Sequence, residues 1–290
     1  MSPQLVWIIT GTSSGLGRNL AQGALKRGDK VIATGRPGGR SAAKLDELVN
    51  EGADILELDV TWPLERIQET AKAAVAIHGR VDVVVNNAGY IQVGVLEEAT
   101  PEETFQQYNT NVFGALNVSR AFLPYMRERK TGTIIFYGSV VGWIGFPYSG
   151  LYSSSKWAIR GIAATLQEEI APLGLRSVCI DPGYFRTSFL GADSRAPEVG
   201  RIPDYKELSQ KAENSLREYN GRQPGDPLKG VEVIVDLIKG EGSATGKPFP
   251  ISLALGSDCY NTCKKTSDSY LKLLEEWKDV SFSTDFDSKN

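Results

Sequence analysis

The residues most suited to chemistry are a tyrosine and a lysine four positions apart, Tyr152 and Lys156, and a serine upstream of them, Ser139. If residues 152–173 form a helix, side chains four positions apart lie on one face, so the Lys156 ammonium lies beside the Tyr152 phenol. A free tyrosine has a pKa of about 10 and moves protons poorly at neutral pH. A nearby cation favours the phenolate and lowers this pKa, so the spacing predicts a tyrosine adapted to acid–base catalysis.

Ser139 ends an apolar, strand-like run at residues 133–138. This position places its hydroxyl at the carboxyl end of a strand, which is the edge where open α/β sheets bind their ligands. A Tyr-x-x-x-Lys pair alone is also typical of an ordinary helix surface. The interpretation as a catalytic site therefore depends on the elements that position these residues.

Short apolar strands alternate with helical stretches along most of the chain. Strands are expected at residues 5–9, 30–34, 54–58, 81–85, 133–138, 176–180 and 249–254, with helices between them that include 42–49, 63–78, 101–129 and 228–239. Alternation at this spacing predicts an α/β fold, with a doubly wound parallel sheet of about seven strands flanked by helices.

We expect a single domain over residues 1–290. The cofactor-binding and catalytic core covers 3–187, and regular alternation lapses at 188–227, which is typical of a substrate loop or lid. A last helix and strand occupy 228–256, and a helical C-terminal extension follows at 257–290. The extension carries an apolar face that either packs on its own domain or contacts another subunit; its residues are Tyr270, Leu271, Leu273, Leu274 and Trp277.

The composition excludes several classes of protein. A net charge of −3, with 41% hydrophobic and 23% charged residues, argues for a globular protein and against a nucleic-acid partner. No apolar run is long enough for membrane insertion, and the first residues lack a signal-peptide pattern. Three cysteines make no disulfide framework, which indicates a cytoplasmic location. With His78 as the single histidine, serine-hydrolase chemistry and a metal site are both poor explanations.

Three glycines, Gly11, Gly15 and Gly17, follow the first strand and open the first helix. Such glycines permit a tight turn and let the backbone approach the pyrophosphate of a dinucleotide. The second strand ends without the carboxylate that NAD sites use for the ribose, and Arg36 stands there instead. Arg36, with Arg40 as a second candidate, could bind a 2′-phosphate through its planar guanidinium. The pattern favours NADP(H) over NAD(H).

Taken together, these motifs resemble those of the short-chain dehydrogenase/reductase family in its single-domain branch. The resemblance covers about residues 5–187 and rests on Gly11-x-x-x-Gly15-x-Gly17, Asp59, Asn86-Asn87-Ala88-Gly89, Asn111, Ser139, Tyr152-x-x-x-Lys156 and Pro182-Gly183 with Thr187. It implies a Rossmann-type fold and an NADP(H)-preferring, ketoreductase-like enzyme. One departure is Ser14, which stands in the glycine turn where many NADP-using members have a basic residue.

The resemblance also implies a role for each matching residue. Cofactor phosphates and adenosine would be held by Gly11, Ser13, Ser14, Gly15, Leu16, Gly17 and Asp59; the central strand and cofactor would be supported by Asn87, Ala88 and Gly89; and the nicotinamide would be lined by Pro182, Gly183, Phe185 and Thr187. Tyr152 would be the general acid and Ser139 would stabilise the alkoxide. Lys156 would lower the Tyr152 pKa and bind the nicotinamide ribose. Asn111 would hold a relay water.

Apolar side chains near the predicted site indicate the substrate class. They are Trp143, Ile144, Phe146, Tyr148, Tyr184, Phe185, Phe189 and Leu190. They either form an apolar wall or pack their loops down, and they predict a medium-sized hydrophobic or aromatic ketone, aldehyde or alcohol of secondary or lipid metabolism. Two alternatives are a non-redox step, such as isomerisation, dehydration or cyclisation, and a nucleotide-binding regulator without turnover. Because the family commonly assembles, a homodimer or homotetramer is expected.

Overall fold

The computed structural model describes residues 3–38, 41–191, 195–196 and 200–286. Its centre is one seven-stranded sheet in the order β3-β2-β1-β4-β5-β6-β7, and every neighbouring pair is parallel. The strands are β1 (Val6–Ile9), β2 (Lys30–Gly35), β3 (Asp54–Glu57), β4 (Val83–Asn86), β5 (Gly132–Tyr137), β6 (Leu175–Pro182) and β7 (Ser252–Leu255). The predicted Rossmann-type doubly wound sheet is confirmed, and its order reverses between β1 and β4, where such folds bind ligands.

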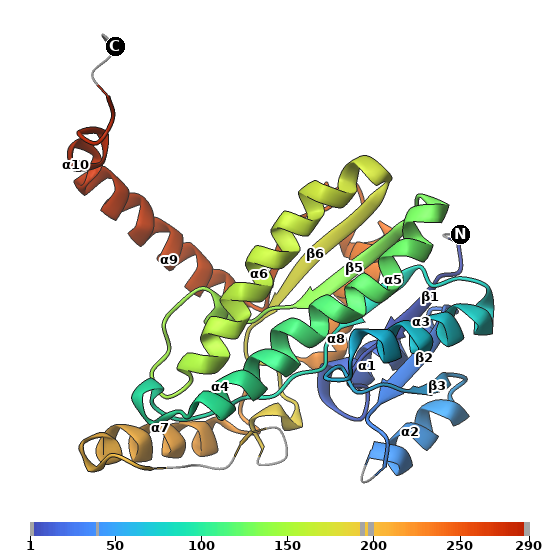
Figure 1. Cartoon of the computed structure of the whole chain (residues 1–290), viewed down its shortest axis with the longest axis horizontal. Helices are drawn as coiled ribbons and strands as arrows, with labels where there is room; N and C mark the ends of the chain where they lie inside the picture. The colour runs from blue at the N-terminus through green and yellow to red at the C-terminus, as the bar shows by residue number, and fades with distance from the viewer. Residues whose placement is uncertain (1–2, 39–40, 192–194, 197–199, 287–290) are drawn as a thin grey trace.

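Helices cover both faces of the sheet (Figure 1). One face packs against α1 (Gly15–Lys26), α2 (Ser41–Asn50) and α8 (Pro227–Lys239), and the other against α3 (Leu64–His78), α5 (Ala115–Arg129) and α6 (Gly150–Ile170). Successive strand residues point to opposite faces, so Ile8 enters one core while Trp7 and Ile9 enter the other. Burial on both sides explains why these strands are continuous apolar runs in the sequence.

The long helix expected at residues 101–129 is divided. It consists of α4 (Pro101–Tyr108), a π-helical segment (Asn109–Gly114) and α5. Thr100 caps α4 by accepting a hydrogen bond from Glu103 N, and the Glu103 side chain bonds back to Thr100 N. The π-helical turn departs from the regular hydrogen-bond ladder, a feature that is frequent at functional sites.

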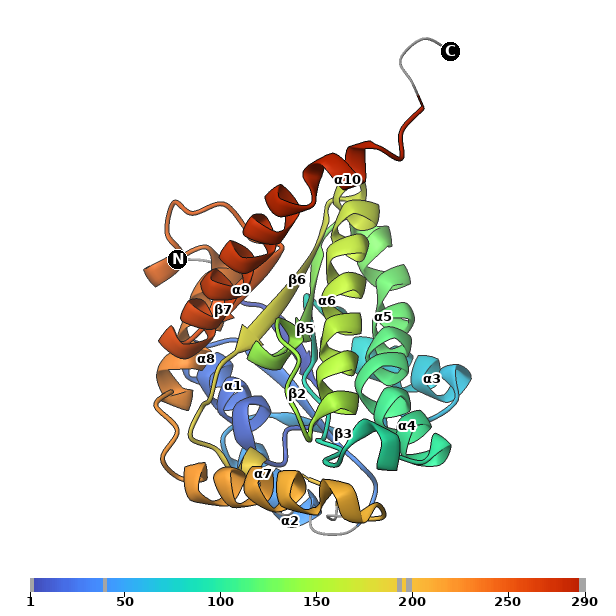
Figure 2. The same ribbon diagram turned by 90° about the vertical axis from the view of Figure 1, so that its left-hand side faces the viewer.

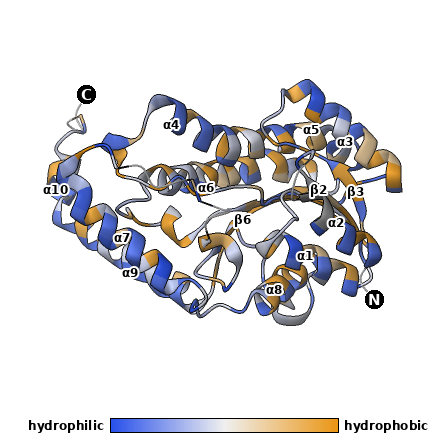
Figure 3. Cartoon of the chain, turned by 90° about the horizontal axis from the view of Figure 1, so that it is seen from below, coloured by the Kyte–Doolittle hydropathy of each residue, from blue (hydrophilic) through white to orange (hydrophobic). Residues whose placement is uncertain are grey.

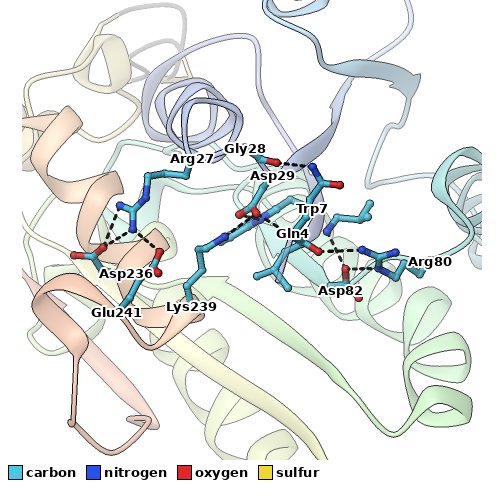
Figure 4. Close-up of polar contacts among 12 residues, drawn as sticks. Gln4, Trp7, Arg27, Gly28, Asp29, Arg80, Asp82, Asp236, Lys239 and Glu241 are labelled. Atoms are coloured by element: carbon cyan, nitrogen blue, oxygen red, sulfur yellow. Dashed lines mark hydrogen bonds and ion pairs between the residues drawn. The ribbon is translucent and has the colours of Figure 1, made fainter. Parts of the chain in front are cut away.

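Charged residues join the first part of the chain to α8 at the amino edge of the sheet (Figure 4). The buried Asp29 accepts hydrogen bonds from Trp7 Nε1 at 3.0 Å and from Lys239 Nζ at 2.8 Å. Arg27 pairs with Asp236 and Glu241 beside them. These contacts tie the α1–β2 turn to α8, and they lie at the strand ends opposite to Ser139.

The predicted substrate loop contains one long helix, α7 (Lys206–Tyr219), which lies across the carboxyl end of the sheet (Figures 1 and 2). The C-terminal extension, expected as one helix, breaks at Trp277 into α9 (Ser257–Glu276) and α10 (Lys278–Phe282).

Only the beginning of the extension packs on the body of the molecule. Cys259 and Cys263 are buried, whereas Leu271, Leu274 and Trp277 are exposed, and α9 stands clear of the sheet in Figure 1. Apolar and polar residues mix along α9 in Figure 3. Among the described residues, no helix has the length and apolar character needed to cross a bilayer.

Candidate active site

A cavity of about 660 Å³ opens at the carboxyl edge of the sheet, beneath α7. Most of the predicted site residues line it: Gly11, Ser13, Ser14, Gly15, Leu16, Arg36, Asp59, Asn87, Ala88, Gly89, Ser139, Tyr152, Lys156, Pro182, Gly183, Phe185 and Thr187. Gly17 and Asn111 are the predicted residues that do not line it. The structure therefore brings together side chains that the sequence separates by more than a hundred residues.

The glycine turn is held by Asn87, which follows β4. Its Nδ2 donates to the carbonyl oxygens of Thr10 at 2.8 Å and Gly11 at 3.0 Å. A Cβ on Gly17 would lie 2.2 Å from the same nitrogen, so only glycine fits there. Gly11 has a φ of 71°, which glycine adopts without strain. Gly17 and Asn87 thus fix the conformation of the glycine turn.

The start of α1 fits the diphosphate of a dinucleotide. Ser14 is its N-cap residue, yet the Ser14 side chain makes no capping hydrogen bond, and the first turn contains no acidic residue. The first N–H groups of a helix have no partner within the helix, and the helix dipole favours an anion beside them. A phosphate at this turn would therefore meet free donors and no opposing charge.

The ends of β2 and β3 form the far wall of the cavity. Arg36 follows β2 directly and is exposed, while Asp59 accepts hydrogen bonds from Thr61 N at 2.9 Å and Thr61 Oγ1 at 2.7 Å. Arg36 therefore lines the cavity at the tip of β2, where the sequence has no acidic residue. Arg40, the second predicted cation, lies outside the described residues.

Three predicted catalytic residues converge on the cavity. Ser139 caps the short turn after β5, and Tyr152 and Lys156 lie one helical turn apart on α6. All three are at most 9% exposed. The Tyr152 phenol is hydrogen-bonded to the Ser139 side chain, and its ring packs 6.1 Å from the Phe189 ring. The Tyr-x-x-x-Lys pair is thus part of a buried cluster and not an ordinary helix surface.

The environment of Tyr152 contradicts one prediction. Lys156 Nζ donates to the carbonyl oxygen of Tyr137 at 2.7 Å and lies 5.6 Å from the centroid of the Tyr152 ring. Burial raises the pKa of Tyr152 above its ordinary value, and the hydrogen bond with Ser139 acts in the opposite direction. A Tyr152 pKa below its ordinary value is therefore not found in this structure, because burial outweighs the effects that oppose it; the contribution of Lys156 itself stays a prediction. Tyr152 is protonated at neutral pH.

Burial acts on the lysine as well. It lowers the pKa of Lys156 to about 8, while the thiol of Cys179 and the carboxylate of Asp181 act in the opposite direction. An ammonium in an apolar environment loses hydration, so its neutral form is favoured. Lys156 therefore titrates within two units of neutral pH.

Asn111 supports the cluster from the π-helical segment. Its Oδ1 accepts from Tyr90 N at 3.2 Å, and its Nδ2 donates to Tyr90 O at 3.1 Å and to Ser155 Oγ at 3.2 Å. Ser155 Oγ in turn donates to the carbonyl oxygen of Tyr152 at 2.7 Å. The amide of Asn111 thus joins the segment after β4 to the helix that carries Tyr152.

The expected apolar wall is only partly present. The predicted residues that line the cavity are Phe146, Tyr184, Phe185, Phe189 and Leu190. Ile144 and Tyr148 do not line it, and neither does Trp143. Its ring stacks 3.5 Å from the Arg160 guanidinium, and its Nε1 bonds a buried carboxylate. Some of the predicted wall residues therefore pack their own loop.

That carboxylate belongs to Asp181, which sequence reasoning did not identify. It is fully buried at the end of β6. Its Oδ1 accepts from Ser139 N at 3.2 Å, and its Oδ2 accepts from Trp143 Nε1 at 3.0 Å and Ser252 Oγ at 2.7 Å. Arg160 Nε lies 3.4 Å from Oδ2. The only sequence signal is its place at a strand end, directly before the Pro-Gly pair.

Residues of the lid were missed as well. Arg195, Leu216 and Gln223 all line the cavity from the segment after β6. No local pattern marks them, because their position depends on how α7 folds back over the sheet. Among the described residues, no cluster of histidine, cysteine or acidic side chains is arranged to hold a metal ion.

The fold and site define a dinucleotide-binding α/β enzyme with a Ser–Tyr–Lys cluster beside its nucleotide turn. A sequence profile described as short chain dehydrogenase matches residues 5–198. The chain belongs to the short-chain dehydrogenase/reductase family, whose members are oxidoreductases that use a nicotinamide cofactor.

Two curated relatives are similar over most of the chain. Oxidoreductase BOA17 of Botryotinia fuckeliana is 31% identical over 279 residues, which cover 96% of this chain and 98% of that protein. The 3-ketodihydrosphingosine reductase of Bacteroides thetaiotaomicron is 37% identical over 226 residues, which cover 77% and 80% of the two chains.

Solved structures agree with this assignment. A short-chain dehydrogenase from Streptomyces avermitilis superposes with a TM-score of 0.85 at 36% identity, over 99% of this chain and 100% of that one. ElxO with NADP bound has a TM-score of 0.71 at 25% identity, over 89% and 100%. A family member from Burkholderia phymatum in complex with NAD has a TM-score of 0.77 at 22% identity, over 93% and 95%, which shows the shared fold alone.

Proposed function

We propose that this chain is an NADPH-dependent ketoreductase that reduces a ketone or aldehyde on a medium-sized hydrophobic or aromatic substrate. The observation that carries the proposal is the buried cluster of Ser139, Tyr152 and Lys156 on the same cavity as the glycine turn. Such a cluster supplies a proton and stabilises an alkoxide beside a bound nicotinamide. A non-redox enzyme or a regulator would have no use for all three side chains.

The residues present fit the cofactor along the whole cavity. The turn at Gly11–Gly17 and the start of α1 would hold the diphosphate, and Arg36 would hold the 2′-phosphate. Gly183 and Thr187 would lie along the nicotinamide, and Lys156 would bind its ribose hydroxyls. The nicotinamide would supply the hydride that reaches the carbonyl carbon.

The side chains of this chain would handle the carbonyl oxygen and its proton. Ser139 would donate a hydrogen bond to this oxygen, and Tyr152 would transfer its phenolic proton to it as negative charge develops. The phenol of Tyr152 carries its proton before the reaction begins, as reduction of a carbonyl requires. Asn111 would hold a water that returns a proton to the cluster.

Replacing Tyr152 tests this role. Tyr152→Phe removes only the hydroxyl, so we expect kcat for ketone reduction to fall by about 100-fold or more. The Kd for NADPH should change by less than about twofold, because the ring and the nucleotide turn remain. NADPH oxidation with a panel of aromatic and polycyclic ketones measures the first, and titration calorimetry the second.

Tyr125→Phe is the matched control, since Tyr125 loses the same atom from α5, away from the cavity. A Tyr152→Phe variant that keeps more than a tenth of the turnover would show that another group donates the proton. Cofactor binding with a changed but unreduced substrate would point to a non-redox reaction.

The preference for NADP(H) is proposed from Arg36. Arg36→Asp replaces a phosphate-binding cation by a carboxylate suited to the ribose hydroxyls, so the NADPH/NADH ratio of kcat/KM should fall by about tenfold or more. Arg120→Asp, an equal charge change on the exposed side of α5, should leave the ratio unchanged. An unaltered ratio in Arg36→Asp would refute the role of Arg36.

We further infer one domain that assembles as a homodimer or homotetramer in the cytoplasm. The exposed apolar face of α9 supports self-association. The three free cysteines support a reducing compartment. Neither the inferred assembly nor the inferred compartment alters the proposed reaction.

A further inference from the structure

The predicted lid contributes buried polar atoms that have no hydrogen-bond partner among the described residues. Gln223 is 1% exposed and lines the cavity. Within the described part of the chain, neither its Oε1 nor its Nε2 has a hydrogen-bond partner. Leaving buried polar atoms unpaired is costly, and proteins seldom do so without a reason. A pair of such atoms on the wall of an enzyme cavity indicates a ligand that satisfies them.

The backbone of Gln223 is held firmly. Its carbonyl oxygen accepts from Arg186 Nε at 3.1 Å and from Arg186 Nη2 at 3.0 Å. Two residues later, Gly225 N donates to Tyr184 O at 2.9 Å, and Arg186 N donates to Gly225 O at 2.9 Å. The segment that contains Gln223 and Gly225 is therefore hydrogen-bonded alongside the residues that follow β6, as an added strand would be. The backbone that carries Gln223 is therefore preorganised, which lowers the cost of ordering it when a ligand binds.

Arg195 adds a second unpaired group to the same wall. Its Nη1 and Nη2 donate to the Glu213 carboxylate at 2.7 Å and 2.9 Å, and both side chains are at most 9% exposed. Its Nε, which is buried, has no partner among the described residues. Burial opposes ionisation of Glu213, yet hydrogen bonds from Arg195 and Arg217 hold its pKa below the usual value. Glu213 thus accepts from both guanidinium groups, and Arg195 keeps one buried N–H donor without a partner among the described residues.

These atoms define the chemistry of what they bind. An amide offers one acceptor and one donor, which a hydroxyl satisfies in both directions. The Nε–H of Arg195 needs only an acceptor. The second guanidinium on Glu213 belongs to Arg217, which is 65% exposed to water and does not line the cavity, so the buried Arg195–Glu213 pair presents no net charge to a ligand. Apolar residues, Phe189 and Leu216 among them, line the same cavity.

We propose that Gln223 and Arg195 are specificity-determining residues that bind uncharged oxygen atoms of the substrate, a hydroxyl at Gln223, away from the carbonyl that is reduced. This inference rests on the proposed ketoreductase function and narrows its substrate class. The substrate is a hydroxylated ketone or aldehyde with an otherwise apolar skeleton. A skeleton without such oxygen leaves the amide unpaired and binds less well.

The test compares ketones in matched pairs, with Gln223→Leu as the variant. The probes are straight-chain 2-alkanones of graded length, phenyl-substituted butanones, and the same compounds carrying a terminal or ring hydroxyl. Wild-type protein should prefer hydroxylated members by about tenfold or more in kcat/KM, and Gln223→Leu should abolish that preference. Gln210→Leu makes the same change on the exposed side of α7 and should keep the preference.

Two further measurements separate this role from others. Denaturant unfolding should show Gln223→Leu to be at least as stable as the wild type, since an apolar side chain replaces unpaired polar atoms. The Kd for NADPH should stay within about twofold. Lower stability would assign Gln223 to the fold, and a weakened NADPH Kd with the preference intact would assign it to the cofactor; either result overturns the proposal.

Failure of the proposed ketone reduction can be distinguished from failure of the proposed recognition site. Calorimetric binding of the same pairs to the NADP-saturated protein measures the preference without turnover. A Gln223-dependent preference in binding without reduction would reject the ketoreductase activity and keep the recognition site. Reduction with no dependence on Gln223, or no preference in either assay, would reject the recognition site.

Discussion

Lys156 carries a charge into the protein interior with a backbone carbonyl as its hydrogen-bond partner. Its side chain belongs to a residue only 6% exposed, and burial is the largest cause that lowers its pKa to about 8 from 10.5. A difference of this size corresponds to about 3 kcal/mol of free energy of unfolding, which the folded protein loses while the ammonium is charged. The proposed ribose contact therefore has a cost in stability.

The pH dependence follows from the direction of this shift. Below about pH 8 both states hold the proton, and the cost is complete; between about 8 and 10.5 the unfolded state binds more protons, so this contribution to stability rises with pH. Lys156→Met removes the titrating ammonium and, with it, this dependence of stability on pH. The stability of Lys156→Met relative to wild type should therefore fall by about 2 kcal/mol between pH 7 and pH 10.

Urea unfolding at several pH values measures this difference. Lys72→Met, on the exposed side of α3, is the control and should show a difference that does not vary with pH. A constant difference for Lys156→Met would mean that Lys156 keeps an ordinary pKa in the folded protein.

At this scale, sequence reasoning found the side chains but not their environment. The four-residue spacing of Tyr152 and Lys156 is a local property of a helix, and it correctly places them together on α6. The pKa of Tyr152 depends on burial beneath Phe189 and the lid, which no spacing encodes. Its direction was therefore predicted wrongly.

At the scale of elements, Asp181 joins the ends of β5, β6 and β7 to α6. Donors from Ser139, Trp143 and Ser252 converge on its two oxygens. A neutral amide has one acceptor oxygen and would turn its NH₂ group toward donors. The carboxylate is thus the side chain that this junction requires.

We expect Asp181→Asn to lower the free energy of unfolding by about 3 kcal/mol, since it leaves buried donors unpaired and removes the counter-charge of Arg160. Ser252→Ala removes one donor and keeps the carboxylate, so it should cost about 1 kcal/mol. Urea denaturation of both variants gives the comparison. Equal losses, or an Asp181→Asn variant as stable as wild type, would contradict this account.

The elements themselves were mostly predictable. The strands are continuous apolar runs, and Pro63, Gly79 and Asp226 mark helix ends by their own local chemistry. The π-helical segment and the break at Trp277 were not predicted, because both interrupt sequences with ordinary helical patterns. Asp181, Arg195 and Gln223 were not predicted as site residues, because no local sequence pattern marks residues that reach the cavity only when the chain folds.

At the scale of the whole molecule, α9 presents a side that its own body does not cover. Tyr270, Leu271, Leu274 and Trp277 are each more than half exposed. The sequence predicted the apolar face but not whether its own domain or another subunit packs against it. In the structure, the rest of the described chain does not cover these side chains. A second copy of the chain is the partner we infer for it.

Light scattering coupled to size-exclusion chromatography tests this. The wild type should be a dimer or tetramer at micromolar concentration, and the double change Leu274→Asp with Trp277→Asp should weaken self-association by about 100-fold or more. Lys272→Asp, on the same helix, should have little effect. A monomeric wild type would reject the assembly.

The ion pair between Asp29 and Lys239 spans 210 residues of chain. During synthesis, the turn that carries Asp29 leaves the ribosome long before its partner, with a core that lacks α8. The first half of the protein therefore remains incompletely packed until α8 has been synthesised. Growing chains of this enzyme are expected to be at risk of aggregation until translation is nearly complete.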